Sequence, residues 1–226
     1  MTLPGKLQRP KSLTDLAVER IRSTIIEGHF ALGEQLSEIT LASTLGISKT
    51  PVREALFQLK LEGLVDVHPQ RGTFVFDLTE DEVIDLCAFR ELIESAALAK
   101  AMSVSRERLA LALDQILAAT VTAEKSGDYK AIAALDSRFH EMIVASSGSC
   151  NLASAYRLVA YKIQALRSRL PAQDSEVEHC NDKHKLIVDE IRTGTVARAQ
   201  KLLRDHIRST QDAYLAASSN KVALTA

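Results

Sequence analysis

Three of the six histidines in this 226-residue chain, together with one aspartate, fall on the apolar faces of three predicted helices. The four residues are Asp136, His140, His184 and His206. Burying a carboxylate and several imidazoles in a helical core is unfavourable unless something pairs them. A divalent metal ion held by all four side chains would satisfy them together, so we predict one metal ion per chain.

This prediction depends on helix geometry, because side chains three or four positions apart share one face. Asp136 and His140 are four residues apart and border the apolar stripe that contains Phe139. His184 and His206 stand about one turn from the apolar residues of their own helices. The alternative is that each histidine is an ordinary core residue with its own hydrogen bonds.

The composition limits the class of protein. The chain is 46% hydrophobic, carries a formal net charge of -1 and contains no Trp, so global charge does not indicate a nucleic-acid partner. Cys87, Cys150 and Cys180 show no disulfide spacing, which is typical of the reducing cytosol. No apolar run approaches the roughly 20 residues that span a bilayer. We therefore expect a cytoplasmic protein with no membrane contact.

The first third of the chain has the pattern of a winged helix-turn-helix. Helices are predicted over 12–27 and 37–45, and a third begins near 48–51 and ends at Gly63. We favour Thr50 as the N-cap of the third helix, with Pro51 as its first residue, over the other candidate cap, Ser48. The segment 65–76 alternates as a β-hairpin, the only sheet we expect. The predicted domain covers 1–76, with a loose arm over 1–11.

The rest of the chain predicts an all-α bundle. A linker over 77–80 leads into a capping box formed by Thr79 and Glu82. Helices are expected at 80–102, 106–126, 128–147, 150–170, 174–193 and 195–217. The fold class is thus mainly α, with an antiparallel bundle of six or seven helices over 81–218 and a tail over 219–226.

The third helix could read DNA, because the second helix of a helix-turn-helix presents its N-terminal residues to the major groove. In this chain those residues are Ser48, Lys49, Thr50 and Arg53, and the hairpin tip adds Arg71 and Gly72. Residues 1–76 hold nine Lys/Arg against eight Asp/Glu, so charge alone is weak support. A protein-binding winged helix, or a small bundle with solvated charges, is the alternative.

The stretch GEQLSEITLASTLGISKTPVREALFQLKLEGLVDVHPQRGTFV closely resembles the winged-helix signature of the GntR family of bacterial transcription regulators. Ala31 replaces a common proline and Lys49 a common arginine, and a lysine favours phosphate contact over base readout. The resemblance implies a homodimer on a near-palindromic double-stranded DNA operator. It also implies DNA contacts from Ser48, Lys49, Thr50, Arg53, Arg71, Gly72 and Thr73.

The segments DSRFHEMI, HKLIVDEI and ARAQKLLRDHI resemble the metal-binding FCD-type ligand-sensing domain of the FadR subfamily. The resemblance implies that Asp136, His140, His184 and His206 are the metal ligands. Such donors suit Zn, Ni, Mn or Fe, and zinc is the ion that we expect. Four protein donors leave coordination positions open for a small carboxylate effector. The resemblance further implies that Arg90 faces the effector, whereas a surface pair with Glu94 is the alternative.

The sequence therefore predicts a DNA-binding transcriptional regulator, expected to be a repressor, whose operator binding responds to a small organic acid at the metal. In one alternative the metal ion itself is the signal. A more remote alternative is a metal-dependent hydrolase. No HExxH motif is present, and Glu141 points about 100° away from His140 on an ideal helix. We do not expect an enzyme.

Overall fold

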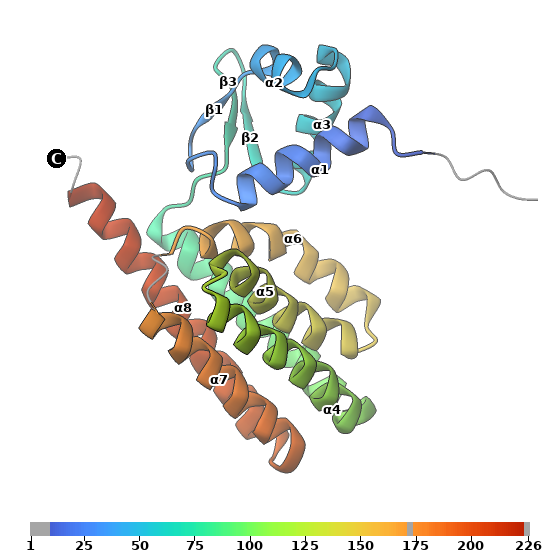
Figure 1. Cartoon of the computed structure of the whole chain (residues 1–226), viewed down its shortest axis with the longest axis vertical. Helices are drawn as coiled ribbons and strands as arrows, with labels where there is room; N and C mark the ends of the chain where they lie inside the picture. Colours follow the sequence, from blue (N-terminus) through green and yellow to red (C-terminus); the bar gives the residue numbers. More distant parts are fainter. Residues whose placement is uncertain (1–9, 171–173, 224–226) are drawn as a thin grey trace, which may run out of the picture. The chain divides into compact units, whose positions relative to one another are not determined.

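The computed structural model describes residues 10–170 and 174–223 (Figure 1). The chain divides into two compact units, Met1–Asp77 and Leu78–Ala226. Most of the predicted N-terminal arm, residues 1–9, lies outside the described residues. No helix in the described part of the chain is long and apolar enough to cross a membrane.

Three helices form the body of the first unit: α1 (Leu13–Ile26), α2 (Glu38–Leu45) and α3 (Lys49–Leu61). α1 begins with a capping box, in which Ser12 and Asp15 satisfy each other's backbone N–H groups. Gly46 ends α2 in the left-handed conformation that glycine adopts without strain. α2, the turn at Gly46 and α3 form the predicted helix-turn-helix.

The start of α3 differs from the prediction. The N-cap is Ser48 and not Thr50, so Pro51 is the third helical residue and not the first. Proline is tolerated there because the N–H groups of the first turn have no partner within the helix. The side chain of Ser48 makes no capping hydrogen bond.

The sheet has three strands, not the two of a hairpin: β1 (Gln35–Leu36), β2 (Val65–His68) and β3 (Gly72–Val75), in the order β1-β3-β2 and antiparallel throughout. β1 is only two residues long, too short for an alternating pattern to reveal it. It pairs Leu36 with Thr73, so β3 is the central strand.

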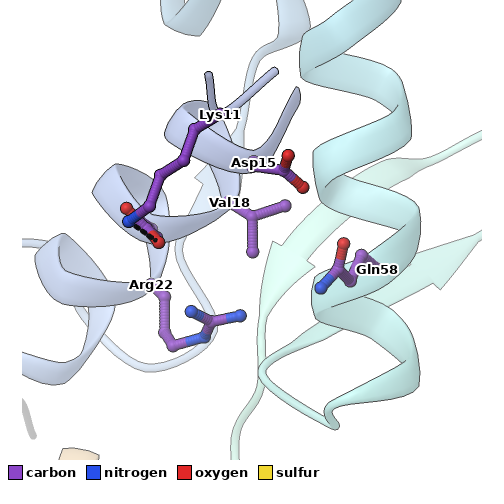
Figure 2. A pocket seen from close by; sticks show the side chains of 6 residues that line it. Lys11, Asp15, Val18, Arg22 and Gln58 are labelled. Carbon is purple, nitrogen blue, oxygen red and sulfur yellow. Dashed lines mark hydrogen bonds and ion pairs between the residues drawn. The ribbon is translucent and has the colours of Figure 1, made fainter. Parts of the chain in front are cut away.

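α1 and α3 run side by side in the same direction. The hydroxyl of Thr14 donates to Glu54, and eight residues further along both helices Arg22 donates to Glu62. A hollow of about 180 Å³ lies between them, with Val18 and Gln58 on its walls (Figure 2). The buried stripe of α1 begins at Ala17, whereas Leu13 and Leu16 are exposed.

The second unit consists of α4 (Glu80–Ser126), α5 (Tyr129–Ser146), α6 (Cys150–Arg167), α7 (Asp174–Thr193) and α8 (Val196–Ala223) (Figure 1). The capping box of Thr79 and Glu82 opens α4 as predicted. Ser105 has non-helical angles and divides α4 at the break expected between two helices. α8 continues to Ala223, into the segment predicted to be a tail. The bundle is all helical, so the mainly α fold is confirmed.

Candidate functional site

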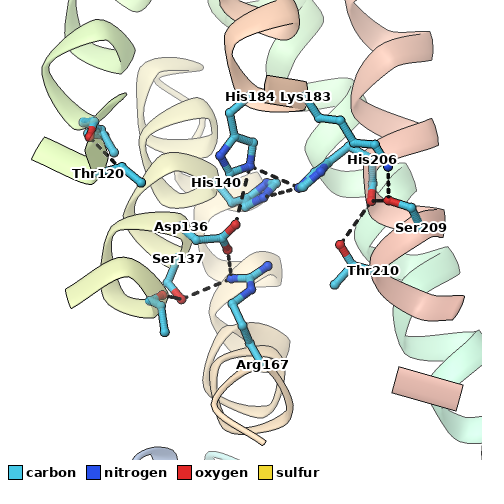
Figure 3. Close-up of polar contacts among 12 residues, drawn as sticks. Thr120, Asp136, Ser137, His140, Arg167, Lys183, His184, His206, Ser209 and Thr210 are labelled. Carbon is cyan, nitrogen blue, oxygen red and sulfur yellow. Dashed lines mark hydrogen bonds and ion pairs between the residues drawn. The ribbon is translucent and has the colours of Figure 1, made fainter. Parts of the chain in front are cut away.

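Four titratable side chains meet inside the helical unit (Figure 3). Asp136 and His140 come from α5, His184 from α7 and His206 from α8. All four are buried, with exposed fractions of 8%, 0%, 3% and 1% in that order. One ligand atom from each lies within 4.8 Å of the others. The structure thus brings together the four residues that the sequence singled out.

The ring nitrogens converge on one point. His206 Nε2 lies 3.2 Å from His140 Nε2 and 3.1 Å from His184 Nε2. Two nitrogens bound at about 2.1 Å to one ion lie about 3.0 Å apart at a right angle and about 3.4 Å apart at the tetrahedral angle. A single proton on His206 Nε2 could serve only one of the two neighbouring lone pairs, whereas a metal ion takes all three. These residues fit a divalent ion.

The protonation states suit metal binding as well. Burial lowers the pKa of His184 to about 4, against the opposing effect of Asp136. Burial also lowers the pKa of His140 and of His206 well below the usual range. A metal-binding histidine must be neutral. All three imidazoles are therefore in the binding form at neutral pH without a proton having to leave.

Asp136 is held by Arg167 at the end of α6. The Arg167 guanidinium forms an ion pair with Asp136 Oδ2, while Oδ1 lies 3.5 Å from His184 Nε2 (Figure 3). Burial alone would raise the pKa of Asp136, but Arg167 and His184 hold it well below the ordinary value. The carboxylate is charged, with one oxygen directed toward the histidines. Arg167 also donates to the Ser137 hydroxyl, at 3.2 Å.

His140 has a carboxylate behind it. Its Nδ1 lies 2.6 Å from Glu94 Oε2, and Arg90 Nε donates to Glu94 Oε1 at 2.5 Å. All three residues are fully buried. Burial raises the pKa of Glu94, and Arg90 opposes that shift. Burial disfavours the charge on Arg90, but Glu94 keeps the pKa of the guanidinium above its ordinary value.

The alternative pairing of Arg90 with Glu94 is therefore present, but the pair is buried and not at the surface. Its members lie on the buried face of α4, where the large side chain of Arg90 has no exposed area. Arg90 Nη1 and Nη2 have no hydrogen-bond partner among the described residues. Unused donors of a buried guanidinium are a place where an anion could bind.

Neither the contact of Glu94 with His140 nor any role of Arg167 was predicted from the sequence. A signal existed for both. Val83, Cys87, Arg90 and Glu94 follow the three-to-four spacing of one buried face of α4. Arg167 continues the spacing of the buried residues of α6. A charged residue at a core position of a helix indicates a buried partner of opposite charge.

The predicted DNA-contacting residues of α3 stand on the surface. Ser48, Lys49, Thr50 and Arg53 are all exposed at its N-terminal end, and no acidic residue lies in the first turn. A helix N-terminus carries free N–H groups and partial positive charge, which favours phosphate. Arg53 is paired with Glu38 of α2, at 2.9 Å between Nη2 and Oε2. Base readout by Arg53 would have to break or share this exposed pair.

The wing tip is fixed by Gln35 of β1. Its Nε2 donates to the carbonyl of Arg71 at 2.9 Å, and a Cβ at Gly72 would lie 2.9 Å from the same nitrogen. Gly72 has a φ of 112°, a backbone angle that requires glycine, and a Cβ there would also displace the Gln35 side chain. Arg71 is exposed at the tip, whereas Thr73 is half-buried between its two partner strands.

Comparison with known proteins matches both units. Residues 13–75 match the family model of bacterial regulatory proteins of the gntR family, and residues 85–209 match the FCD domain. The gluconate operon transcriptional repressor of Bacillus subtilis (strain 168) is 25% identical over 197 residues, which cover 85% of this chain and 81% of that protein.

A helix-turn-helix transcriptional regulator of Agrobacterium vitis is 32% identical over 132 residues, which cover 57% of this chain and 77% of the relative. In the solved structures, a GntR transcriptional regulator from Rhodococcus sp. RHA1 has the same fold, with a TM-score of 0.77 at 22% identity over 91% of this chain and 99% of that one. These proteins are transcription regulators and not enzymes, so the hydrolase alternative is wrong. The chain belongs to the GntR family of bacterial transcription regulators and carries a C-terminal FCD domain.

Proposed function

We propose that this chain is a transcriptional repressor whose operator binding is controlled by a small carboxylate effector at a metal ion in the helical unit. It acts as a homodimer on a near-palindromic operator. The observation that carries the proposal is the convergence of three neutral, buried Nε2 atoms beside the charged Asp136 carboxylate.

The DNA-reading part of the proposal rests on α3 and the wing. Ser48, Lys49 and Thr50 contact phosphates, Arg53 reads a base edge, and the tip with Arg71, Gly72 and Thr73 approaches the backbone or minor groove. The exposed first turn of α3, with no acidic residue and an unused Ser48 hydroxyl, supports this assignment.

The metal-binding part of the proposal assigns Asp136, His140, His184 and His206 as ligands, with zinc as the expected ion. When bound, the ion would supply a Lewis-acidic centre with open positions for an oxygen ligand. The residues around it already neutralise and orient the ligands: Arg167 holds Asp136, and Glu94 stands behind His140.

Two observations support an anionic effector. Arg90 is buried with four terminal N–H donors that no described residue accepts, and a carboxylate is the anion whose two oxygens match a guanidinium. One relative is named for control of a gluconate operon, and gluconate is a small carboxylate. We therefore propose that Arg90 contacts the effector carboxylate.

The test uses an operator selected from random double-stranded DNA and zinc-loaded full-length protein. Fluorescence anisotropy measures operator affinity with zinc alone and with D-gluconate and other small carboxylates added. We expect a carboxylate to weaken operator binding, and we expect the response to vanish after chelation or in the Asp136→Ala/His184→Ala variant. Equal responses before and after chelation would refute the role of the metal.

Two comparisons separate the remaining possibilities. A change in affinity with zinc alone, and none with any carboxylate, would show that the chain senses the metal itself. Arg53→Ala should weaken operator binding about tenfold or more while carboxylate binding stays unchanged. Arg157→Ala, which removes the same charge from an exposed position on α6, serves as its control. Unchanged operator affinity in Arg53→Ala would contradict the assignment of α3.

A further inference from the structure

Glu94 is not one of the metal ligands, yet it touches one of them. We infer that Glu94 is a positioning residue of the metal site: its carboxylate selects the ring tautomer of His140 and directs the Nε2 lone pair toward His184 and His206. The inference rests on the proposed metal site and adds a residue to it.

The contacts of Glu94 divide its two oxygens between two donors. Oε1 accepts from Arg90 Nε at 2.5 Å, and Oε2 lies 2.6 Å from His140 Nδ1. Neutral imidazole carries one proton, and the nitrogen that faces a carboxylate holds it. With the proton on Nδ1, the Nε2 atom of His140 has a free lone pair at the point where the other rings converge.

Arg90 keeps Glu94 in the accepting form. The guanidinium is fully buried, and Glu94 is its sole ion-pair partner among the described residues. A buried guanidinium requires a counter-charge, so the ionised carboxylate is the state that balances it. A protonated Glu94 would instead donate to Nδ1 and put the His140 proton on Nε2.

His140 is distinctive among the three histidines. In the part of the chain that the structure describes, it alone has a carboxylate at the ring nitrogen away from the cluster. His206 Nδ1 has no hydrogen-bond partner there. A carboxylate that accepts a hydrogen bond from a metal-binding histidine fixes the ring and raises its basicity. Glu94 therefore fixes the tautomer and the ring orientation of His140 before a metal ion binds.

The sharpest perturbation is Glu94→Gln, which keeps the shape but offers only one acceptor. If the amide oxygen takes the Arg90 donor, the amide nitrogen faces His140 Nδ1 and donates to it. The ring proton then moves to Nε2, where it blocks coordination. Glu141→Gln makes the same chemical change next to His140 but on the partly exposed side of α5, and serves as the matched control.

Two measurements test the inference on full-length protein. Nitrogen-15 NMR of the metal-free protein reports the His140 tautomer, assigned by the resonance lost in His140→Gln. Competition with a chromophoric chelator reports zinc affinity. We expect Nδ1–H in the wild type and in Glu141→Gln, and Nε2–H in Glu94→Gln. Zinc affinity should fall about 10- to 100-fold in Glu94→Gln and remain unchanged in the control.

The outcomes separate this inference from the metal site. A wild-type His140 with its proton on Nε2 would overturn the inference, and so would unchanged zinc affinity in a folded Glu94→Gln variant. If Glu94→Gln does not fold, the wild-type tautomer still decides. If the wild type binds no zinc, the proposed metal site fails, while the tautomer still confirms or refutes the role of Glu94.

Discussion

The buried ion pair of Arg90 and Glu94 offers a quantitative test of the interior of the helical unit. The perturbation is Arg90→Met, which replaces the guanidinium by an apolar chain of similar length. Both partners have no exposed area, so the variant leaves the Glu94 carboxylate buried without its counter-charge. Removing one partner of a buried pair costs about 3–5 kcal/mol.

The double variant Arg90→Met/Glu94→Met removes both charges and should recover part of that loss. The double variant still leaves His140 Nδ1 without an acceptor, because its wild-type partner is Glu94 Oε2 at 2.6 Å. An unsatisfied buried donor costs about 1–3 kcal/mol, and a pair replaced by apolar residues is often neutral. We therefore expect the double variant to be more stable than the single one.

Scanning calorimetry of chelator-treated protein measures both variants. For a unit of this size, 1 kcal/mol corresponds to about 2–4 °C in Tm, so Arg90→Met should lower the Tm of the helical unit by about 6–20 °C. The double variant should lower it by about 2–12 °C. Arg157→Met, an exposed change on α6, controls for the lost charge. A double variant no more stable than Arg90→Met would refute the argument that Arg90 balances Glu94.

Three further predictions concern metal loading, pH and the wing. Zinc at a thousandfold excess over its Kd should stabilise the helical unit by about 4 kcal/mol, a Tm rise of roughly 8–16 °C that His184→Ala abolishes. Metal-free protein should lose stability as the pH falls from 6.5 to about 4. In this range His184 is protonated in the unfolded chain but stays neutral in the folded one, because burial lowers its pKa to about 4. The effect is at most about 3 kcal/mol for this residue. The lowered pKa values of His140 and His206 add to this loss at low pH, whereas the raised pKa of Glu94 works against it. Urea titrations that show no loss of stability over this pH range would contradict the prediction. Gly72→Ala should destabilise the first unit by about 1–3 kcal/mol in thermal unfolding, because φ is 112° and the new Cβ would displace the Gln35 amide from the Arg71 carbonyl. An unchanged Tm would show that the tip relaxes freely.

The sequence alone identified most of the helices because their signals are local. Thr79 and Glu82 start α4, Gly46 ends α2, and the spacing of His184 from the apolar residues of α7 placed it inside. Such signals extend over one or two turns, which is the range within which neighbouring residues determine conformation.

The features that were missed depend on contacts between distant segments. β1 exists because Gln35 and Leu36 pair with a strand almost forty residues away, and two residues carry no periodicity of their own. Ser48 and Thr50 were both plausible caps, and the choice of Ser48 places Pro51 in a first turn that accepts it.

The site was predicted in its ligands but not in its supporting residues. Side-chain type and helix face together selected Asp136 and the histidines. Glu94 entered only as half of an alternative surface pair, because spacing by four residues on a helix describes a buried pair and an exposed pair equally well. Only the packing of α4 against the other helices separates the two.

The depth of the histidine cluster has a kinetic consequence. With exposed fractions of 8% or less at all four side chains, very little of their surface is open to a solute while the helices stay closed. Binding of a metal ion or an organic acid then requires a transient opening of the bundle. At high solute concentration the observed loading rate should level off at the rate of that opening and not climb without limit. A regulator built in this way would respond on the timescale of its own internal motion, however abundant its signal becomes.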